Sequence, residues 1–209
     1  MKRNTHVIGI VDYNMGNLAS VINAFASLGA EATLESDPSK LAQYDKLILP
    51  GVGAYGDAME HLKSNGMDEA VKTYAKSGNP LLGICLGMQL LFESSEEFGA
   101  TQGLGLIEGQ IVAFDESRFD HALKVPHMGW NELFVDKESP LLSGLEKEFY
   151  LYFVHSYHAV CDDKYAIGKT HYGYEFVSAV QKENIYGFQP HPEKNHENGL
   201  KIIENFVNL

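Results

Sequence analysis

The sequence contains few cysteines, since Cys85 and Cys161 are the two among 209 residues. Two cysteines cannot form a disulfide framework in a chain of this length, so we expect a reducing, cytoplasmic setting. The sequence also lacks any run of about 18 apolar residues, and no transmembrane helix is therefore expected. The opening stretch Met1–Asp12 has a short apolar run with no small-residue cleavage site after it, which predicts a first strand and not a signal peptide.

Basic residues are also scarce, because 16 Lys and Arg stand against 28 Asp and Glu, for a formal net charge of -12. They are scattered along the sequence, whereas nucleic-acid binders need a concentrated positive face. A nucleic-acid partner is therefore not expected. The length is typical of one domain that buries a core around a single sheet, which predicts one domain over residues 1–209.

The pattern of apolar residues predicts an α/β fold with a mostly parallel central sheet and helices on both faces. The expected strands of the first half are Val7–Val11, Ala32–Leu34, Leu47–Leu49 and Leu81–Ile84, and the expected helices are Leu18–Leu28, Tyr55–Ser64 and Met67–Lys76. After about Gly99 short alternating strands dominate, such as Phe176–Val180 and Ile185–Gln189, so this half is expected to be rich in antiparallel strands. A last helix is expected from about Asn198 to Phe206.

One cysteine stands between two glycines where a predicted strand meets a helix, in Gly83-Ile84-Cys85-Leu86-Gly87. The same spacing around a serine forms a strained strand-to-helix turn that exposes a nucleophile. At a helix N-terminus, unpaired N–H groups and the helix dipole favour a thiolate over a thiol. Cys85 is therefore a candidate nucleophile, with the Leu86 amide directed toward an oxyanion. The competing interpretation is that Cys85 is a small buried hydrophobic residue.

A histidine and a carboxylate lie two residues apart in Gln189-Pro190-His191-Pro192-Glu193. In an extended segment such positions face the same side, so Glu193 could orient the ring of His191. A base oriented by an acid is what a cysteine nucleophile requires. The alternative is that His191 packs under the last helix and Glu193 begins its first turn.

A glycine-rich bend follows a predicted strand in Leu49-Pro50-Gly51-Val52-Gly53. Glycines let a backbone N–H turn toward a ligand without interference from a Cβ atom. The bend is too short for a phosphate loop and lacks the Lys-Ser/Thr ending. It is a candidate oxyanion strand, and an ordinary strand-to-helix turn is the alternative.

These three motifs together resemble the class I, triad-type glutamine amidotransferases, and the similarity spans nearly the whole chain. Further motifs resemble, more narrowly, the glutaminase subunits of imidazole glycerol phosphate synthases; they are Asp12–Asn17, Pro126–Asn131, Tyr152–Tyr157 and His191–Lys194. The resemblance implies a three-layer fold that needs neither a metal nor another cofactor. It also implies that Cys85 attacks the side-chain amide of L-glutamine, that His191 passes its proton to the leaving ammonia, and that Glu193 supports the base. The residues implied to hold glutamine or its oxyanion are Val52, Gly53, Leu86, Gln89, His155, Ser156 and Tyr157.

The resemblance further implies a heterodimer with a (β/α)8-barrel cyclase. That partner would combine the ammonia with a ribotide to give imidazole glycerol phosphate and aminoimidazole carboxamide ribotide in histidine biosynthesis. Asn14, Asn17, Trp130 and Lys194 lie in stretches that in the family face the synthase. The alternatives are that Asn17 is simply a helix N-cap and that Trp130 is a core aromatic residue.

The sequence leaves three rival functions open. Pro190 and Asn195 depart from the usual family residues, phenylalanine and serine, and related glutaminases serve sugar amidotransferases that build surface polysaccharides. A non-catalytic subunit that only binds glutamine is a second rival, although the presence of Cys85, His191 and Glu193 argues against it.

A metal-binding protein is a third rival, because four histidines could gather: His155, His158, His191 and His196. The first two are three residues apart, and in a strand-like run this spacing places their rings on opposite faces. That placement argues against chelation and favours the absence of a metal site.

Overall fold

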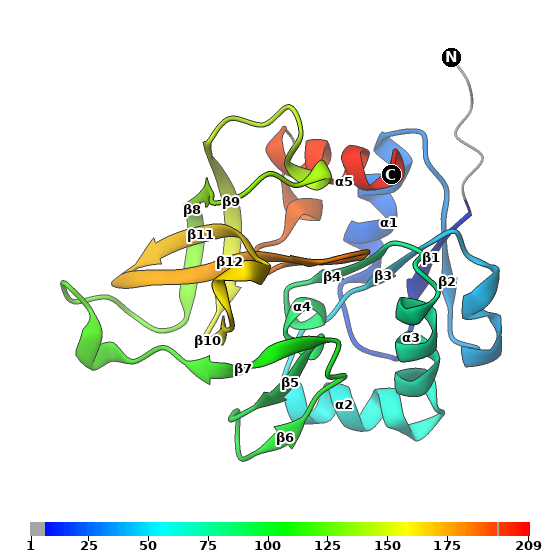
Figure 1. Ribbon diagram of the computed structural model, residues 1–209, viewed down its shortest axis with the longest axis horizontal. Helices are drawn as coiled ribbons and strands as arrows, with labels where there is room; N and C mark the ends of the chain where they lie inside the picture. The colour runs from blue at the N-terminus through cyan, green and yellow to red at the C-terminus, as the bar shows by residue number, and fades with distance from the viewer. Residues whose placement is uncertain (1–6, 196) are drawn as a thin grey trace.

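The computed structural model describes residues 7–195 and 197–209 (Figure 1). The first half consists of β1 (Ile8–Val11), α1 (Leu18–Ser27), β2 (Ala32–Glu35), β3 (Lys46–Leu49), α2 (Tyr55–Ser64), α3 (Met67–Lys76), β4 (Leu81–Ile84) and α4 (Leu86–Leu90). The second half consists of β5 (Phe92–Ser95), β6 (Thr101–Gln102), β7 (Ile107–Ala113), β8 (His127–Val135), β9 (Glu148–His155), β10 (Tyr157–Val160), β11 (Ala166–Tyr172), β12 (Tyr174–Lys182), β13 (Ile185–Phe188) and α5 (Asn198–Val207). Short 3-10 turns lie at Pro38–Gln43, Glu116–Arg118, Pro140–Leu142, Asp163–Tyr165 and Pro192–Lys194.

One mixed sheet of thirteen strands runs through the described residues. Its parallel part has the order β2-β1-β3-β4-β13. Beyond β13 the pairs are antiparallel: β13 pairs with β12, β12 with β10, and β10 with β7. A branch begins at β12, where β11 pairs with β12, β8 with β11 and β9 with β8. The predicted α/β fold is confirmed, and the hairpins of the second half extend the same sheet.

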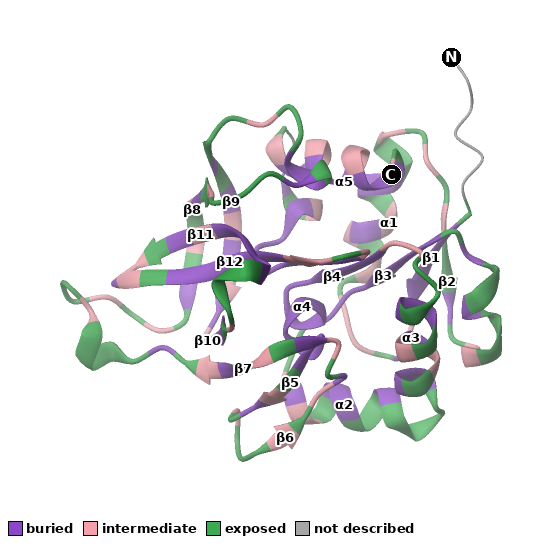
Figure 2. Ribbon diagram, in the orientation of Figure 1, coloured by how far each residue is buried: buried purple, intermediate pink, exposed green. Residues whose placement is uncertain are grey.

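Helices cover both faces of the parallel strands, with α1 and α5 on one face and α2, α3 and α4 on the other (Figure 1). Because strand residues alternate between faces, Leu47 and Leu49 of β3 pack in the core that contains Leu62 of α2. Ile48 between them packs in the core that contains Phe206 of α5. The apolar runs of β1, β3 and β4 therefore mark strands buried on both sides, as the buried residues along them show (Figure 2).

Three neighbouring parallel strands end side by side. The pairing sets Leu49 of β3 beside Gly83 of β4 and Phe188 of β13 beside Ile84 of β4. Three motifs follow these strand ends directly: the glycine-rich bend, the cysteine and the histidine with its carboxylate. In open α/β sheets, sites form at the carboxyl ends of parallel strands, so the topology gathers the three motifs at one edge.

Across residues 7–195 and 197–209, no helix has the length and apolar character needed to cross a membrane.

Candidate active site

Cys85 occupies a strained turn between β4 and α4. Its backbone has φ 54° and ψ -113°, a left-handed conformation that is uncommon for a residue with a side chain. A Cβ atom added at Gly87 would lie 1.8 Å from the Leu49 carbonyl oxygen, and one at Gly83 would lie 2.7 Å from the Gly87 oxygen. The strained turn predicted from the glycine spacing is present, and both glycines are required because backbone segments approach each other closely.

His191 and Glu193 form a buried pair. His191 Nδ1 lies 2.7 Å from Glu193 Oε1, and each side chain is 2% exposed. The segment was expected to be extended, but His191 is the N-cap of a 3-10 turn over Pro192–Lys194. The turn, not strand alternation, brings the carboxylate to the ring. The backbone N–H of His191 also donates to the carbonyl of Tyr152, 2.9 Å away, which anchors the histidine to β9.

The electrostatics of the site favour a charged His191 ring. Burial alone lowers the pKa of His191, but the hydrogen bond and charge of Cys85, followed by those of Glu193, raise this pKa to about 10. Because Glu193 holds Nδ1, the Nε2 atom is the one available to Cys85. Among the described residues, Glu193 Oε2 has no hydrogen-bond partner.

Cys85 and His191 both line one pocket of about 330 Å³. Its lining residues are Val52, Gly53, Cys85, Leu86, Gln89, Glu97, Pro126, Val154, His155, Ser156, Tyr157, His191 and Lys194. Every residue predicted to react with or hold glutamine is in this set except Glu193, which contacts His191 from behind. A larger groove, lined between Val135 and Lys147, contains no cysteine or histidine.

Two further polar side chains reach the site without having been predicted. Gln189 is fully buried, and its Nε2 lies 3.8 Å from Cys85 Sγ. Its position two residues before His191 in the same motif was a signal that could have identified it. Glu97 lines the pocket and accepts a hydrogen bond of 2.8 Å from the Tyr55 N–H. Glu97 stands in an acidic turn, where nothing in the sequence distinguishes it from Glu96.

The residues predicted to face a partner lie near the pocket or on exposed surface. Asn14 is exposed with φ 65°, and Asn17 caps α1 by accepting a 3.4 Å hydrogen bond from the Ser20 N–H. Trp130 is 59% exposed, so its alternative interpretation as a core aromatic residue is wrong. Lys194 lines the pocket.

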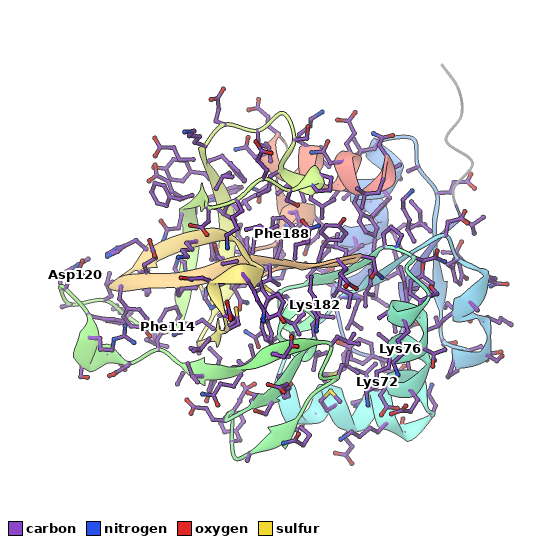
Figure 3. The ribbon with its side chains drawn as sticks, viewed as in Figure 1. Lys72, Lys76, Phe114, Asp120, Lys182 and Phe188 are labelled. Atoms are coloured by element: carbon purple, nitrogen blue, oxygen red, sulfur yellow. The ribbon has the colours of Figure 1, made fainter. Side chains whose placement is uncertain are left out.

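His155 and His158 do not lie on opposite faces, so the placement predicted from their spacing is wrong. Both rings contact the Phe114 ring, with centroids 5.2 and 4.9 Å away, and therefore face the same aromatic cluster (Figure 3 labels Phe114). The reason is that Ser156 interrupts the strand between β9 and β10 and shifts the alternation of side chains. Within the described part of the chain, no group of three or more His, Cys, Asp or Glu side chains could hold a metal ion. His196, the fourth histidine of that alternative, lies outside the described residues.

The buried histidines predict a loss of stability in acid. Burial lowers the pKa of His127 to about 4 and also lowers those of His155 and His158. Unfolding restores the ordinary value of 6.5, so below this pH the unfolded chain binds protons that the folded chain does not. The contribution of these histidines to the free energy of unfolding is therefore fully present above pH 6.5 and decreases as the pH falls toward 4. For His127 alone we expect a loss of about 3 kcal/mol by pH 4.

Denaturant unfolding at a series of pH values measures this loss. His127→Phe should flatten the curve between pH 6.5 and 4, because phenylalanine binds no proton in either state. An exposed histidine substituted as a control, His61→Phe, should leave the slope as it is in the parent chain. Equal slopes for all three proteins would contradict the expectation.

The chain is similar to known proteins over nearly its whole length. The family model described as glutamine amidotransferase class-I matches residues 9–209. The imidazole glycerol phosphate synthase subunit HisH of Sulfurimonas denitrificans is 69% identical over 202 residues, which cover 96% of this chain and 97% of that protein. The protein of the same name from Wolinella succinogenes is 59% identical, with 97% of this chain and all of that protein covered.

Solved structures are similar in fold. PurLQS from Thermotoga maritima matches with a TM-score of 0.77 and 22% sequence identity, covering 98% of this chain and 99% of that chain. A structure described as a glutamine amidotransferase matches with a TM-score of 0.74 and 18% identity, covering 97% of this chain and 100% of that chain.

Proposed function

The chain belongs to the class I glutamine amidotransferase family, and on this premise we propose that it is the glutaminase subunit of an imidazole glycerol phosphate synthase. It hydrolyses L-glutamine to glutamate and ammonia and supplies the ammonia for histidine biosynthesis. The observation that carries the proposal is the single pocket in which Cys85 and His191 meet the expected glutamine contacts. We further propose that residues 1–209 act as one domain and that the protein works in the cytoplasm.

The proposed reaction proceeds through a thioester. The Cys85 thiolate attacks the side-chain amide carbon of glutamine, and His191 gives its proton to the leaving ammonia. A water molecule then attacks the glutamyl thioester while His191 takes a proton from it, and Cys85 departs as thiolate with release of glutamate. Glu193 keeps Nδ1 of His191 protonated and stabilises the imidazolium.

An oxyanion hole is proposed at the Leu86 amide and at the Val52–Gly53 peptide. Both Val52 and Gly53 line the pocket, and Gly53 has φ +100°, a conformation that side chains rarely adopt. A Cβ atom at Gly51 would lie 3.0 Å from the backbone nitrogen of Gly87, so this bend packs closely against the cysteine turn. The glycines on both sides of Val52 allow its peptide to rotate, and only one orientation presents an N–H to the pocket.

Glu97 is proposed to bind the α-ammonium group of glutamine. The pocket is lined by this carboxylate and by the Lys194 side chain, which carries the opposite charge. An amino acid carries both charges on its α-carbon, so Glu97 complements the ammonium and Lys194 the carboxylate.

The partner is proposed to be a (β/α)8-barrel cyclase that docks on β8 and β9. Exposed apolar side chains gather on this hairpin, including Met128 (62% exposed) and Trp130. Exposed apolar patches mark interaction sites. The patch adjoins the pocket, because Val154, which pairs with Met128 in the register, is a lining residue. Ammonia released there would have a short path to the second subunit.

The test is to measure glutamate production by the chain alone, by its complex with the cyclase, and by the complex with a cyclase ligand. We propose that without the partner the Val52 peptide rests in the other orientation. We therefore expect the chain alone to be slower by about 10²–10³, the effect of losing one oxyanion donor. Equal rates in all three samples would rule out such a gate. Failure of the complex to convert glutamine nitrogen into imidazole glycerol phosphate would contradict the proposed pathway.

A further inference from the structure

Two buried histidines form a hydrogen-bonded chain behind the pocket. His127 Nδ1 lies 3.0 Å from His155 Nε2, and His155 Nδ1 lies 2.8 Å from the carbonyl oxygen of Tyr157. At the outer end, Asn131 Nδ2 lies 3.1 Å from His127 Nε2. All four ring nitrogens of the two histidines therefore have a polar partner.

Backbone groups fix the direction of every bond in this chain. A carbonyl only accepts, so His155 must carry its proton on Nδ1 to bond Tyr157, and its Nε2 must accept from His127. Asn131 Nδ2 also donates to the His171 carbonyl at 2.9 Å, which fixes the amide orientation. His127 Nε2 is therefore an acceptor, and both rings are neutral with the proton on Nδ1.

The same carbonyl is shared with the pocket. Gln89 Nε2 donates to the Tyr157 oxygen at 3.0 Å and to Gln189 Oε1 at 2.9 Å. These two bonds use both hydrogens of the Gln89 amide and leave its Oε1 as an acceptor. With its own oxygen engaged, Gln189 presents its NH₂ to Cys85 Sγ.

We propose that His155 and His127 are positioning residues for glutamine binding, which hold the Tyr157 carbonyl and through it the carboxamide of Gln89. This inference rests on the proposed glutaminase function. Neither ring is required to react. Their contribution is to hold the Tyr157 carbonyl oxygen, which also accepts the hydrogen bond from Gln89 in the pocket.

The packing around the rings separates this role from a purely structural one. His127 stacks on Phe153 and Tyr172, with centroid distances of 4.7 and 4.0 Å, so a phenylalanine at 127 would keep the stack and lose the donor. His158 is a matched control for His155, because it is buried against the same Phe114 ring but bonds the Ala159 carbonyl and the Tyr174 hydroxyl instead.

The experiment compares His155→Phe, His155→Asn and His158→Phe in the complex with the cyclase subunit, after glutamine hydrolysis by the parent complex has been established. His155→Phe should raise the KM for glutamine about tenfold with little change in kcat, because the Tyr157 carbonyl that Gln89 binds loses its hydrogen bond from His155. The Nδ2 atom of asparagine stands where the imidazole Nδ1 does, so His155→Asn should restore KM to within about threefold of the parent. His158→Phe should leave KM unchanged. Equal KM values for the two phenylalanine variants would overturn the proposal.

If His155→Phe does not fold, His127→Phe and His127→Asn replace it, since the ring stack survives in the first and the donor in the second. A rise in KM for the first alone supports the proposal, and equal KM values contradict it. The tautomers can also be read without activity, from long-range nitrogen–proton correlations of the histidine rings in the full chain. Protons on Nδ1 of both rings are expected. A proton on Nε2 of His155 would contradict the proposed hydrogen bonds between His127, His155 and Tyr157 even if the protein proves to be a glutaminase.

Discussion

Replacing Cys85 with alanine should abolish glutamine-dependent synthesis by the complex, with a loss of roughly 10⁴-fold or more, because no other group can form the thioester. Synthesis from added ammonium salts should persist, since we propose that the acceptor chemistry belongs to the partner subunit. Alanine keeps a Cβ atom and thus the strained turn with φ 54°, whereas glycine would allow the turn to relax. The measurement is product formation from glutamine and from ammonium salts in parallel.

Cys161 provides the control for this substitution. It is half-buried, lies outside the pocket lining, and burial followed by nearby carboxylates raises the pKa of its thiol to about 11. Cys161→Ala should retain both activities. Glutamine hydrolysis that survived in Cys85→Ala would remove Cys85 from the mechanism, and loss of the ammonium-dependent reaction as well would indicate a damaged complex.

Replacing Glu193 with glutamine should lower kcat by about 10²–10⁴, the range over which general acid–base groups act. The amide occupies the same space and can accept the hydrogen bond from His191 Nδ1. It lacks the negative charge that helps to raise the pKa of His191, so the imidazolium formed during proton transfer loses stabilisation. KM should change little, because Glu193 does not line the pocket that holds Cys85.

The matched control is Glu197→Gln, an exposed glutamate four residues further along the chain. It should leave kcat unchanged. Steady-state kinetics and a thermal melt of each variant separate chemistry from folding. Unchanged turnover in Glu193→Gln would reduce Glu193 to a turn residue, and a drop in kcat that tracks the melting temperature would assign it a structural role.

The sequence predicted the fold where one local signal was sufficient. Helices α2 and α3 and strand β4 begin and end where the apolar periodicity placed them. The cysteine turn was also predictable, because Gly83 and Gly87 flank Cys85 at the spacing that such a turn requires. Such features depend on short stretches of chain, whose conformation neighbouring residues determine.

Features that depend on contacts between distant segments were not predictable. His127 and His155 are 28 residues apart, and Gln89 and Gln189 are 100 residues apart, so no spacing rule relates them. His155 and His158 were predicted to lie on opposite faces of one uninterrupted strand, whereas Ser156 divides β9 from β10. The alternation along a strand does not show which of its two faces is buried, so the sequence left a core position as the alternative to the partner-facing position predicted for Trp130.

The place of β13 in the sheet bears on how the protein is made. This strand follows every other described strand in the chain, yet it lies between β4 and β12 and pairs with both. As the chain leaves the ribosome, β4 and β12 therefore present unpaired edges until residues 185–188 emerge, and such edges invite association with other chains. His191 emerges directly afterwards. The nascent polypeptide thus acquires His191, the proposed base, in the same step that closes its sheet, and a translation product interrupted earlier contains Cys85 but lacks His191.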